Sequence, residues 1–320
     1  MRALRFERYG STDLLRIDDV AEPLARPGQA KVRVHAVSLN PIDWKIASGD
    51  FRLIPLFKGP PRGLGCDFAG EIVAIGGGAT ERHVGERVFG SLLPLARDGA
   101  LAEYLTVAYD RVLALPQGID DRVAAALPIA AGTALQALVD EAGVVAGQRV
   151  LINGAAGGVG HFAVQIATHL GTRVTAVCSG ANADFVRGLG AEEVIDYARD
   201  DFTQRDDRFD VVFDVAGTSS FEAAKRVLTP FGCYLNTLGT MTAAATTVVS
   251  AVIARLTSRQ RAIPIALRNG APMWQRLLQL TDSKVLRPHI ERTIGLDDVA
   301  AALRGMETGH GRGKIVVRIA

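Results

Sequence analysis

A glycine-rich segment, LINGAAGGVG at residues 151–160, constrains the fold more than any other feature of this chain. It follows a short apolar run that is typical of a buried strand, and it opens an apolar-faced stretch, residues 159–170, that is typical of a helix. A glycine loop in this position is the fingerprint of dinucleotide-binding folds, in which loop amides and the helix N-terminus face a pyrophosphate. We expect Gly157 to permit the tight turn and Gly160 to let the helix pack on the strand.

The residues around this loop decide whether it is more than a plain turn. Ala155 stands where the usual motif has its first glycine, which weakens the signal. Around the loop, strands are expected at residues 150–152, 172–178, 193–195, 210–215 and 233–237, with helices at 159–170, 184–189 and 222–228. Strands that alternate with helices predict an α/β fold with a Rossmann-type, doubly wound parallel sheet. The cofactor contacts expected in the loop are Ala155, Gly157, Gly158, Val159 and Gly160.

The sequence outside this region shows a different pattern of hydrophobic and turn-forming residues. Residues 29–39 alternate valine and alanine with charged side chains, which is the period of a half-buried strand. Short strands separated by frequent glycine and proline suggest a small β-rich barrel. A last apolar run at residues 314–319 predicts that the chain returns to this barrel after the parallel sheet. The expected domains are 1–121 for the first part of the barrel, 122–272 for the dinucleotide-binding sheet, and 273–320 for the return.

The composition bounds the class of protein. Of 320 residues, 48% are hydrophobic and 22% charged, and the net charge is only +2. These values are typical of a globular protein and argue against a nucleic-acid partner. The three cysteines, Cys66, Cys178 and Cys233, form no close pair, so a reducing compartment is expected. We expect a soluble cytoplasmic protein with no membrane partner, because no segment resembles a signal peptide or a membrane span.

The residues after the second strand of the sheet indicate which dinucleotide binds. NAD-dependent enzymes place an acidic residue about 20 positions after the loop to hold the ribose hydroxyls. This chain has Ser179 there, and the missing carboxylate leaves room for the 2′-phosphate of NADPH, with Ser179 and Asn182 as expected contacts. The basic residue that neutralises this phosphate stays open, since Asn182 is neutral and Arg187 lies on the next helix.

Four segments carry a resemblance that covers nearly the whole chain. They are SLNPIDWKIASG at 38–49, GCDFAGEIVAIG at 65–76, the AAGGVG loop at 155–160 with LGAEEVIDY at 189–197, and GRGKIVV at 311–317. With them the chain resembles the medium-chain dehydrogenase/reductase superfamily, on its zinc-independent quinone oxidoreductase branch. The resemblance implies a GroES-like catalytic domain, built from both ends of the chain around an inserted Rossmann domain, with the active site in the cleft between them. It also implies a homodimer in which the Rossmann sheets join edge to edge.

The same resemblance implies individual site residues. Asn40 would lie beside the nicotinamide and donate through its amide, while Asp43 and Lys45 would form the cleft wall. A local turn network is the alternative for Asn40 and Asp43, since both residue types favour turns. The further cofactor contacts implied are Thr133, Tyr197, Ala216, Gly217, Leu238, Gly239 and Lys314.

No metal site is expected. Zinc-dependent relatives use a cysteine, a histidine and a cysteine as catalytic ligands, whereas this chain has Asn40, Cys66 and Ala130–Ala131 at or near those positions. Without a Lewis acid, an acceptor that spreads negative charge onto oxygen fits better than an alcohol. We therefore expect NADPH-dependent hydride transfer to a small-molecule quinone or α,β-unsaturated carbonyl.

Two questions stay open from the sequence alone. The segment 240–272 is longer than in the shortest quinone reductases, and its apolar residues at helical spacing are expected to form core or pocket wall. They are Val248, Val249, Val252, Ile253 and Leu256. The alternative functions are an enoyl-thioester reductase of the same superfamily and a non-catalytic NADPH-binding protein.

Overall fold

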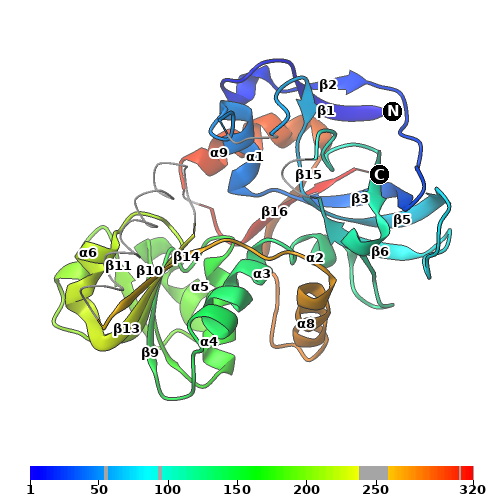
Figure 1. The fold of residues 1–320 in the computed structure, drawn as a ribbon. Helices are drawn as coiled ribbons and strands as arrows, with labels where there is room; N and C mark the ends of the chain where they lie inside the picture. Colours follow the sequence, from blue (N-terminus) through cyan, green and yellow to red (C-terminus); the bar gives the residue numbers. More distant parts are fainter. Residues whose placement is uncertain (54–56, 93–95, 238–258, 310, 320) are drawn as a thin grey trace.

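The computed structural model describes residues 1–53, 57–92, 96–237, 259–309 and 311–319. They form a β-rich region, at the upper right of Figure 1, and a parallel sheet with helices, at the lower left. Each helix in the described part of the chain is too short or too polar to cross a lipid bilayer.

A seven-stranded sheet dominates the β-rich region, in the order β15-β16-β3-β5-β6-β8, with β7 paired to β3. Its strands are β3 (Gln29–Ser38), β5 (Asp67–Ile75), β6 (Arg87–Ser91), β7 (Tyr104–Ala108), β8 (Val112–Ala114), β15 (Ile290–Ile294) and β16 (Lys314–Arg318). The alternation expected in residues 29–39 is confirmed, because Val32 and Val34 are fully buried while Arg33 is exposed. The return of the chain is confirmed as well, since β16 pairs antiparallel with β3 through Val316 and Ser38.

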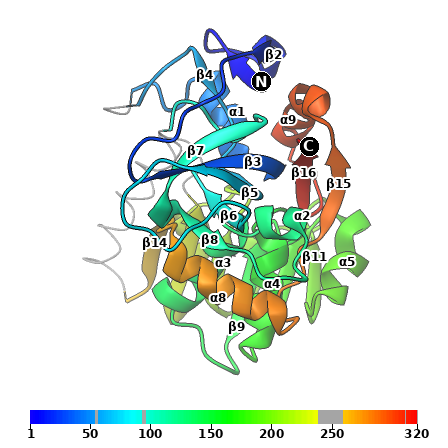
Figure 2. The same ribbon diagram turned by 90° about the vertical axis from the view of Figure 1, so that its right-hand side faces the viewer.

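A smaller sheet and two helices cover one end of this region (Figures 1 and 2). The sheet has the order β2-β1-β4, with β1 (Arg2–Phe6), β2 (Arg16–Asp19) and β4 (Arg62–Gly63). Helix α1 (Pro41–Ser48) starts on a proline, whose fixed φ suits a first helical turn, and ends at Gly49 with a left-handed φ of 94°. It packs against α9 (Val299–Glu307). The residue before α1 is Asn40, so this packing fixes the position of a predicted site residue.

The second region is a six-stranded, fully parallel sheet in the order β11-β10-β9-β12-β13-β14. Its strands are β9 (Arg149–Asn153), β10 (Arg173–Cys178), β11 (Glu193–Asp196), β12 (Phe209–Asp214), β13 (Leu228–Thr237) and β14 (Arg261–Ile265). Helix α2 (Asp121–Ala125) packs on β3, β5 and β6 of the seven-stranded sheet. The helices of the second region are α3 (Ala130–Leu135), which continues as the π-helix η3 (Gln136–Glu141), α4 (Gly160–His169), α5 (Ala183–Gly188), α6 (Phe221–Ala224) and α8 (Ala271–Asp282). Parallel strands with helical crossovers confirm the doubly wound fold.

One expected element differs from the structure. The helix expected at 222–228 is α6 followed by a 3-10 turn at Lys225–Val227, and β13 already begins at Leu228. Leu228 pairs with Phe209 of β12 and is 3% exposed, so its side chain belongs to the sheet core rather than to a helix face. The apolar set at 248–256 lies outside the described residues.

The two regions share an apolar core. One continuous cluster of buried side chains includes Phe89 and Val316 of the β-rich region together with Val150 and Trp274 of the other. The rings of Phe89 and Trp274 lie 6.1 Å apart between centroids. Burial of large apolar side chains across the junction stabilises one relative placement of the two regions.

Candidate active site

Gly154 makes the tight turn of the glycine loop. Its φ of 81° lies in the left-handed region that glycine adopts without strain. The φ of Gly157 is not positive, and its N–H donates to the carbonyl oxygen of Gly154 at 3.1 Å, so the turn expected at Gly157 was placed wrongly. The expectation for Gly160 is confirmed, because a β-carbon there would lie 2.1 Å from the Gly154 carbonyl oxygen. Helix α4 can therefore start this close to the end of β9 only at a glycine.

The glycine loop lies against the segment that leads into β16. The N–H of Gly313 donates to the carbonyl oxygen of Ala156 at 2.8 Å. A β-carbon on Gly158 would meet the carbonyl oxygen of Gly313 and the Cδ of Lys314, both at 3.5 Å. The structure thus brings together two residues predicted from distant parts of the sequence, Gly158 and Lys314. Of the other loop residues, Ala155 is fully buried and Val159 partly exposed.

Lys314 and Asn40 form the centre of a buried polar network. The Nζ of Lys314 donates to the side-chain oxygen of Asn40 at 2.7 Å and to the carbonyl oxygen of Leu39 at 2.8 Å. The Nδ2 of Asn40 donates to Oδ2 of Asp67 at 3.0 Å and to the carbonyl oxygen of Ser38 at 3.2 Å. Lys314 and Asn40 are each 2% exposed, and Asp67 is fully buried. Both N–H groups and the oxygen of the amide are therefore engaged, which fixes its orientation.

Burial shifts the ionisable groups of this network. Loss of hydration raises the pKa of Asp67 to about 6, although the nearby Lys314 opposes the rise. It also raises the pKa of Asp43 to about 7. For Lys314, burial lowers the pKa to about 8 against the attraction of both carboxylates. An ammonium between two carboxylates compensates their charge, and groups with shifted pKa values concentrate at functional sites as well as in structural ion clusters.

Asp43 contacts backbone on both sides of the network. Its Oδ2 accepts the N–H of Asn40 at 2.8 Å, and its Oδ1 accepts the N–H of Gly65 at 3.0 Å. The side chain is fully buried and so offers no surface to a ligand, which favours the local turn network over the cleft wall for this residue. Lys45 is half-buried on α1, with its Nζ 5.5 Å from the centroid of the Trp44 ring, and burial lowers its pKa.

Asp67 also connects the network to the parallel-sheet region. Its Oδ2 accepts the backbone N–H of Ile129, just before α3, at 3.1 Å. Thr133 lies one turn further along α3 and is 7% exposed. Asn40 and Thr133, both expected to contact the cofactor, are therefore near each other in the fold, although no side-chain bond joins Thr133 to the network among the described residues.

A pocket of about 650 Å³ opens at the carboxyl ends of the parallel strands. Its lining includes Asn153 at the end of β9, Tyr197 after β11 and Gly217 after β12. Strand β9 lies between β10 and β12, where the chain order of the sheet reverses, and ligands of open α/β sheets bind at this place. Tyr197 is 53% exposed, and Ala216 beside the pocket is exposed too. The predicted contacts Leu238 and Gly239 lie outside the described residues.

Asp214, which sequence reasoning missed, shapes the loop beside this pocket. Its carboxylate accepts the backbone N–H groups of Gly217 and Ser219, both at 2.9 Å. It also accepts the side-chain N–H of Asn153 at 2.8 Å and the hydroxyl of Tyr234 at 2.9 Å. A buried carboxylate with four such donors holds the turn after β12 in place. The sequence signal was an aspartate at the end of an apolar strand followed by a glycine.

Ser179 and Asn182 lie together after β10, and an arginine from the other region joins them. The Nδ2 of Asn182 donates to the hydroxyl of Ser179 at 3.2 Å. The Nε of Arg312 donates to Oδ1 of Asn182 at 2.8 Å. Arg187, by contrast, pairs with Asp184 at 3.0 Å on the exposed side of α5. Sequence reasoning missed Arg312, although its place in the GRGK motif was visible.

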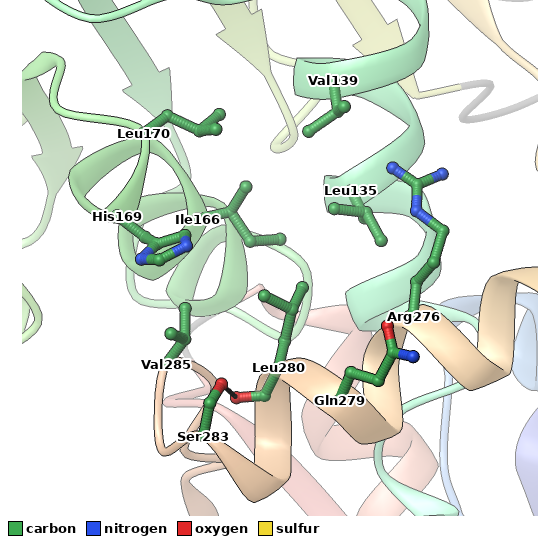
Figure 3. A pocket seen from close by; sticks show the side chains of 10 residues that line it. All are labelled: Leu135, Val139, Ile166, His169, Leu170, Arg276, Gln279, Leu280, Ser283 and Val285. Carbon is green, nitrogen blue, oxygen red and sulfur yellow. Dashed lines mark hydrogen bonds between the residues drawn. The ribbon is translucent and has the colours of Figure 1, made fainter.

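A second pocket, of about 460 Å³, lies between α3, η3, α4 and α8 (Figure 3). Its lining is mainly apolar, with Leu135, Ile166 and Leu280 facing one another across it. None of the predicted site residues that the structure describes lines this pocket. The candidate site therefore remains at the glycine loop and the polar network.

The residues at the zinc-ligand positions do not fit a zinc ion. The side-chain oxygen of Asn40 accepts from Lys314, which places an ammonium next to the first position. Burial raises the pKa of the Cys66 thiol well above its usual value, whereas zinc binds the thiolate. Ala131, near the third position, has no donor atom. Within the described ranges, no group of three or more His, Cys, Asp or Glu side chains is arranged to hold a metal.

Comparisons with known proteins match both regions. The family model described as "Alcohol dehydrogenase GroES-like domain" matches residues 26–117, and the one described as "Zinc-binding dehydrogenase" matches residues 189–317. The chain is 33% identical over 329 residues to the chloroplastic quinone-oxidoreductase homolog of Spinacia oleracea, covering 99% of this chain and 98% of that protein. It is 30% identical over 330 residues to the chloroplastic NADPH-dependent alkenal/one oxidoreductase of Arabidopsis thaliana, with 99% and 79% covered.

A solved structure agrees with these matches over the full length. The quinone oxidoreductase from Coxiella burnetii has a TM-score of 0.89 and 31% identity, with 100% of this chain and 99% of that chain covered. The GroES-like region, the doubly wound parallel sheet and their arrangement are thus those of a known enzyme class. The chain belongs to the medium-chain dehydrogenase/reductase superfamily, on its quinone oxidoreductase-like branch.

Proposed function

We propose that this chain is an NADPH-dependent oxidoreductase that transfers a hydride to quinones or α,β-unsaturated carbonyls without a metal. The approach of Gly158 to Lys314 carries the proposal, because it puts a buried ionisable network beside the loop expected to bind a pyrophosphate. The names of the spinach and Arabidopsis relatives support the cofactor and the two acceptor classes.

The residues that would hold NADPH lie along the carboxyl edge of the parallel sheet. Backbone amides of the glycine loop and the N-terminus of α4 offer donors for the pyrophosphate. Ser179 and Asn182 would contact the 2′-phosphate, and Tyr197 the adenosine side. The remaining proposed contacts are Asn40, Thr133, Ala216, Gly217, Leu238, Gly239 and Lys314.

Bound NADPH supplies the hydride, while the protein aligns the acceptor and stabilises negative charge on its oxygen. Asn40 cannot supply the proton that completes the reduction, because an amide does not titrate near neutrality. Both of its N–H groups are engaged, so it would donate to an acceptor oxygen by giving up its longer bond, the one of 3.2 Å to Ser38. The bond from Lys314 would keep the amide oriented during this exchange. The completing proton would come from water or a nearby hydroxyl.

An NADPH-oxidation screen over quinones, enones and saturated aldehydes tests the proposal. We expect turnover with quinones or enones and little with aldehydes, since only the former spread the incoming negative charge. C4-deuterated NADPH should give a primary isotope effect where hydride transfer limits the rate. Absence of turnover with every quinone and enone would contradict the proposal, and retained NADPH binding would then favour the non-catalytic alternative.

Activity with crotonyl-CoA distinguishes the proposed function from the alternative of an enoyl-thioester reductase. It presents the same conjugated carbonyl as a free enone, but it carries the phosphates of coenzyme A. We expect free enones of similar reactivity to give the higher kcat/KM. A clear preference for crotonyl-CoA would move the assignment to an enoyl-thioester reductase of the same superfamily.

The assembly we propose is a homodimer joined along β14. This strand lies at one edge of the parallel sheet and pairs only with β13 among the described strands. An edge strand offers unpaired backbone groups to a second copy. Light scattering after size exclusion should give the mass of two chains, and a monomer would contradict the assembly. Fractionation of the producing cells should place the protein in the cytoplasm, as we also propose.

A further inference from the structure

Arg312 belongs to the segment before β16, yet its guanidinium lies against the loop after β10. Its Nε donates to Oδ1 of Asn182 at 2.8 Å, and its Nη2 donates to the carbonyl oxygen of Ala181 at 3.2 Å. The guanidinium carbon is 5.2 Å from the centroid of the Phe185 ring. Two hydrogen bonds and an aromatic contact hold this half-buried side chain in one place across the junction.

Among the residues that the structure describes, none of opposite sign pairs with Arg312. Nearby Arg187, by contrast, pairs with Asp184, and Arg199 lies 3.8 Å from Asp196. A carboxylate stands close by, because a β-carbon on Gly180 would be 2.7 Å from Oδ2 of Asp196. Arg199 already faces this carboxylate, so Arg312, which has no such partner among the described residues, is the cation placed to face an anion that binds after β10.

We propose that Arg312 recognises the 2′-phosphate of NADPH, together with Ser179 and Asn182. The proposal rests on the function proposed above and names the residue that selects its cofactor. In dinucleotide-binding folds the ribose 2′ position lies at the end of the second strand, which here is β10. A guanidinium has five N–H donors, and the two bonds to Asn182 and Ala181 leave three for a phosphate. Its planar fork matches phosphate oxygens.

The same segment contacts the rest of the candidate site. Gly313 bonds to Ala156 of the glycine loop, and Lys314 bonds to Asn40 of the polar network. Three consecutive residues of the β-rich region thus reach the proposed phosphate position, the loop and the network. The catalytic region therefore takes part, through Arg312, in a selection of the cofactor to which Ser179 and Asn182 of the Rossmann region also contribute.

Calorimetric binding of two adenosine nucleotides to the full chain tests this inference without any hydride transfer. The probes are adenosine 2′,5′-bisphosphate, which carries the 2′-phosphate, and AMP, which lacks it. We expect the wild type to prefer the bisphosphate, and Arg312→Gln to reduce that preference by about tenfold to a hundredfold, the range of a lost charge-assisted bond. Arg312→Lys should keep part of it, since charge remains and the fork is lost.

Arg187→Gln is the matched control, because it removes another arginine near the same loop. It should leave the preference unchanged. AMP affinity within each variant reports whether the adenosine side is still folded, so a damaged loop cannot imitate the expected result. An unchanged preference in Arg312→Gln, or a loss of equal size in Arg187→Gln, would overturn the assignment. The NADPH-oxidation screen of the wild type judges the proposed function separately, since it does not depend on these variants.

Discussion

At the nicotinamide end of the proposed site, Asn40, Asp67 and Lys314 are buried and every polar group of the amide is bonded. At the adenosine end, Ser179 and Asn182 are partly exposed, and a single bond of 3.2 Å joins their side chains. The first set is a buried network of charges in low dielectric, whereas the second is an open edge next to a 650 Å³ pocket.

This difference determines which substitutions each end of the site can tolerate. A change in the buried network leaves a charge or a donor without a partner, so fold and turnover should suffer together. At the open edge, water can hydrogen-bond to a group that has lost its contact through a substitution. Cofactor preference should therefore shift while the fold persists. Variants at the two ends, with matched controls, test whether they differ in this way.

The largest effect is expected from Lys314→Met, which leaves Asp67 and Asp43 buried without their counter-charge. Breaking a buried ion cluster costs about 3–5 kcal/mol, so the free energy of unfolding in urea should fall by that order. The matched control is Lys225→Met, which breaks an exposed pair with Glu222 and should cost about 0–1 kcal/mol. Equal losses of unfolding free energy in both variants would show that the stability of the buried network does not depend on the charge of Lys314.

Asn40→Ala should slow turnover by roughly one to three powers of ten, the range for loss of one oriented donor. Asn40→Asp should be as harmful or worse, because a carboxylate would face Asp67 and would oppose negative charge on the acceptor oxygen. Titration of NADPH by its fluorescence should show a smaller change in affinity than in kcat for both variants. Full turnover in Asn40→Ala would show that Asn40 stabilises a turn and has no role in hydride transfer.

Ser179→Asp should move cofactor preference toward NADH by about tenfold, since the new carboxylate repels a 2′-phosphate and can hold ribose hydroxyls. Because Ser179 is partly exposed, stability should change by only about 0.5 kcal/mol. Ser283→Asp introduces the same charge at the exposed end of α8 and should leave the preference unchanged. Fluorescence titrations with NADPH and NADH measure both variants.

The smallest effect is expected from metal removal. Incubation with a chelator should leave the rate unchanged, and elemental analysis of the purified protein should find no stoichiometric zinc. The reason is the ammonium of Lys314 beside Asn40 and the protonated thiol of Cys66. One retained zinc per chain that is needed for activity would show that the network rearranges around a cation.

The fold could be predicted almost entirely from the sequence, because hydrophobic periodicity and the positions of glycines are local signals. Residues 29–39 and the strand–loop–helix at 149–169 show this. The turn at Gly154 was misassigned because several glycines in one loop look alike until their φ angles are known. The start of β13 was missed because Leu228 suits a helix face and a buried strand equally well.

The candidate site was predictable only in part. Asn40 and Lys314 came from the family resemblance, but periodicity and spacing could not show that they touch, since the pairing of β3 with β16 creates that contact. The bond between Arg312 and Asn182 is likewise a contact between distant segments. The sequence gives no measure of burial for Asp43, and burial is what separates its backbone role from a place in the cleft wall.

The pairing of Ser38 with Val316 also bears on how the protein acquires its activity during folding. The parallel sheet is assembled from segments that follow one another closely along the chain, whereas β3 and β16 come from opposite ends of the described residues. Closing such a long loop is slow compared with local pairing. In a refolding experiment, helical circular dichroism should therefore recover first. Enzymatic activity should lag behind it until Lys314 reaches Asn40.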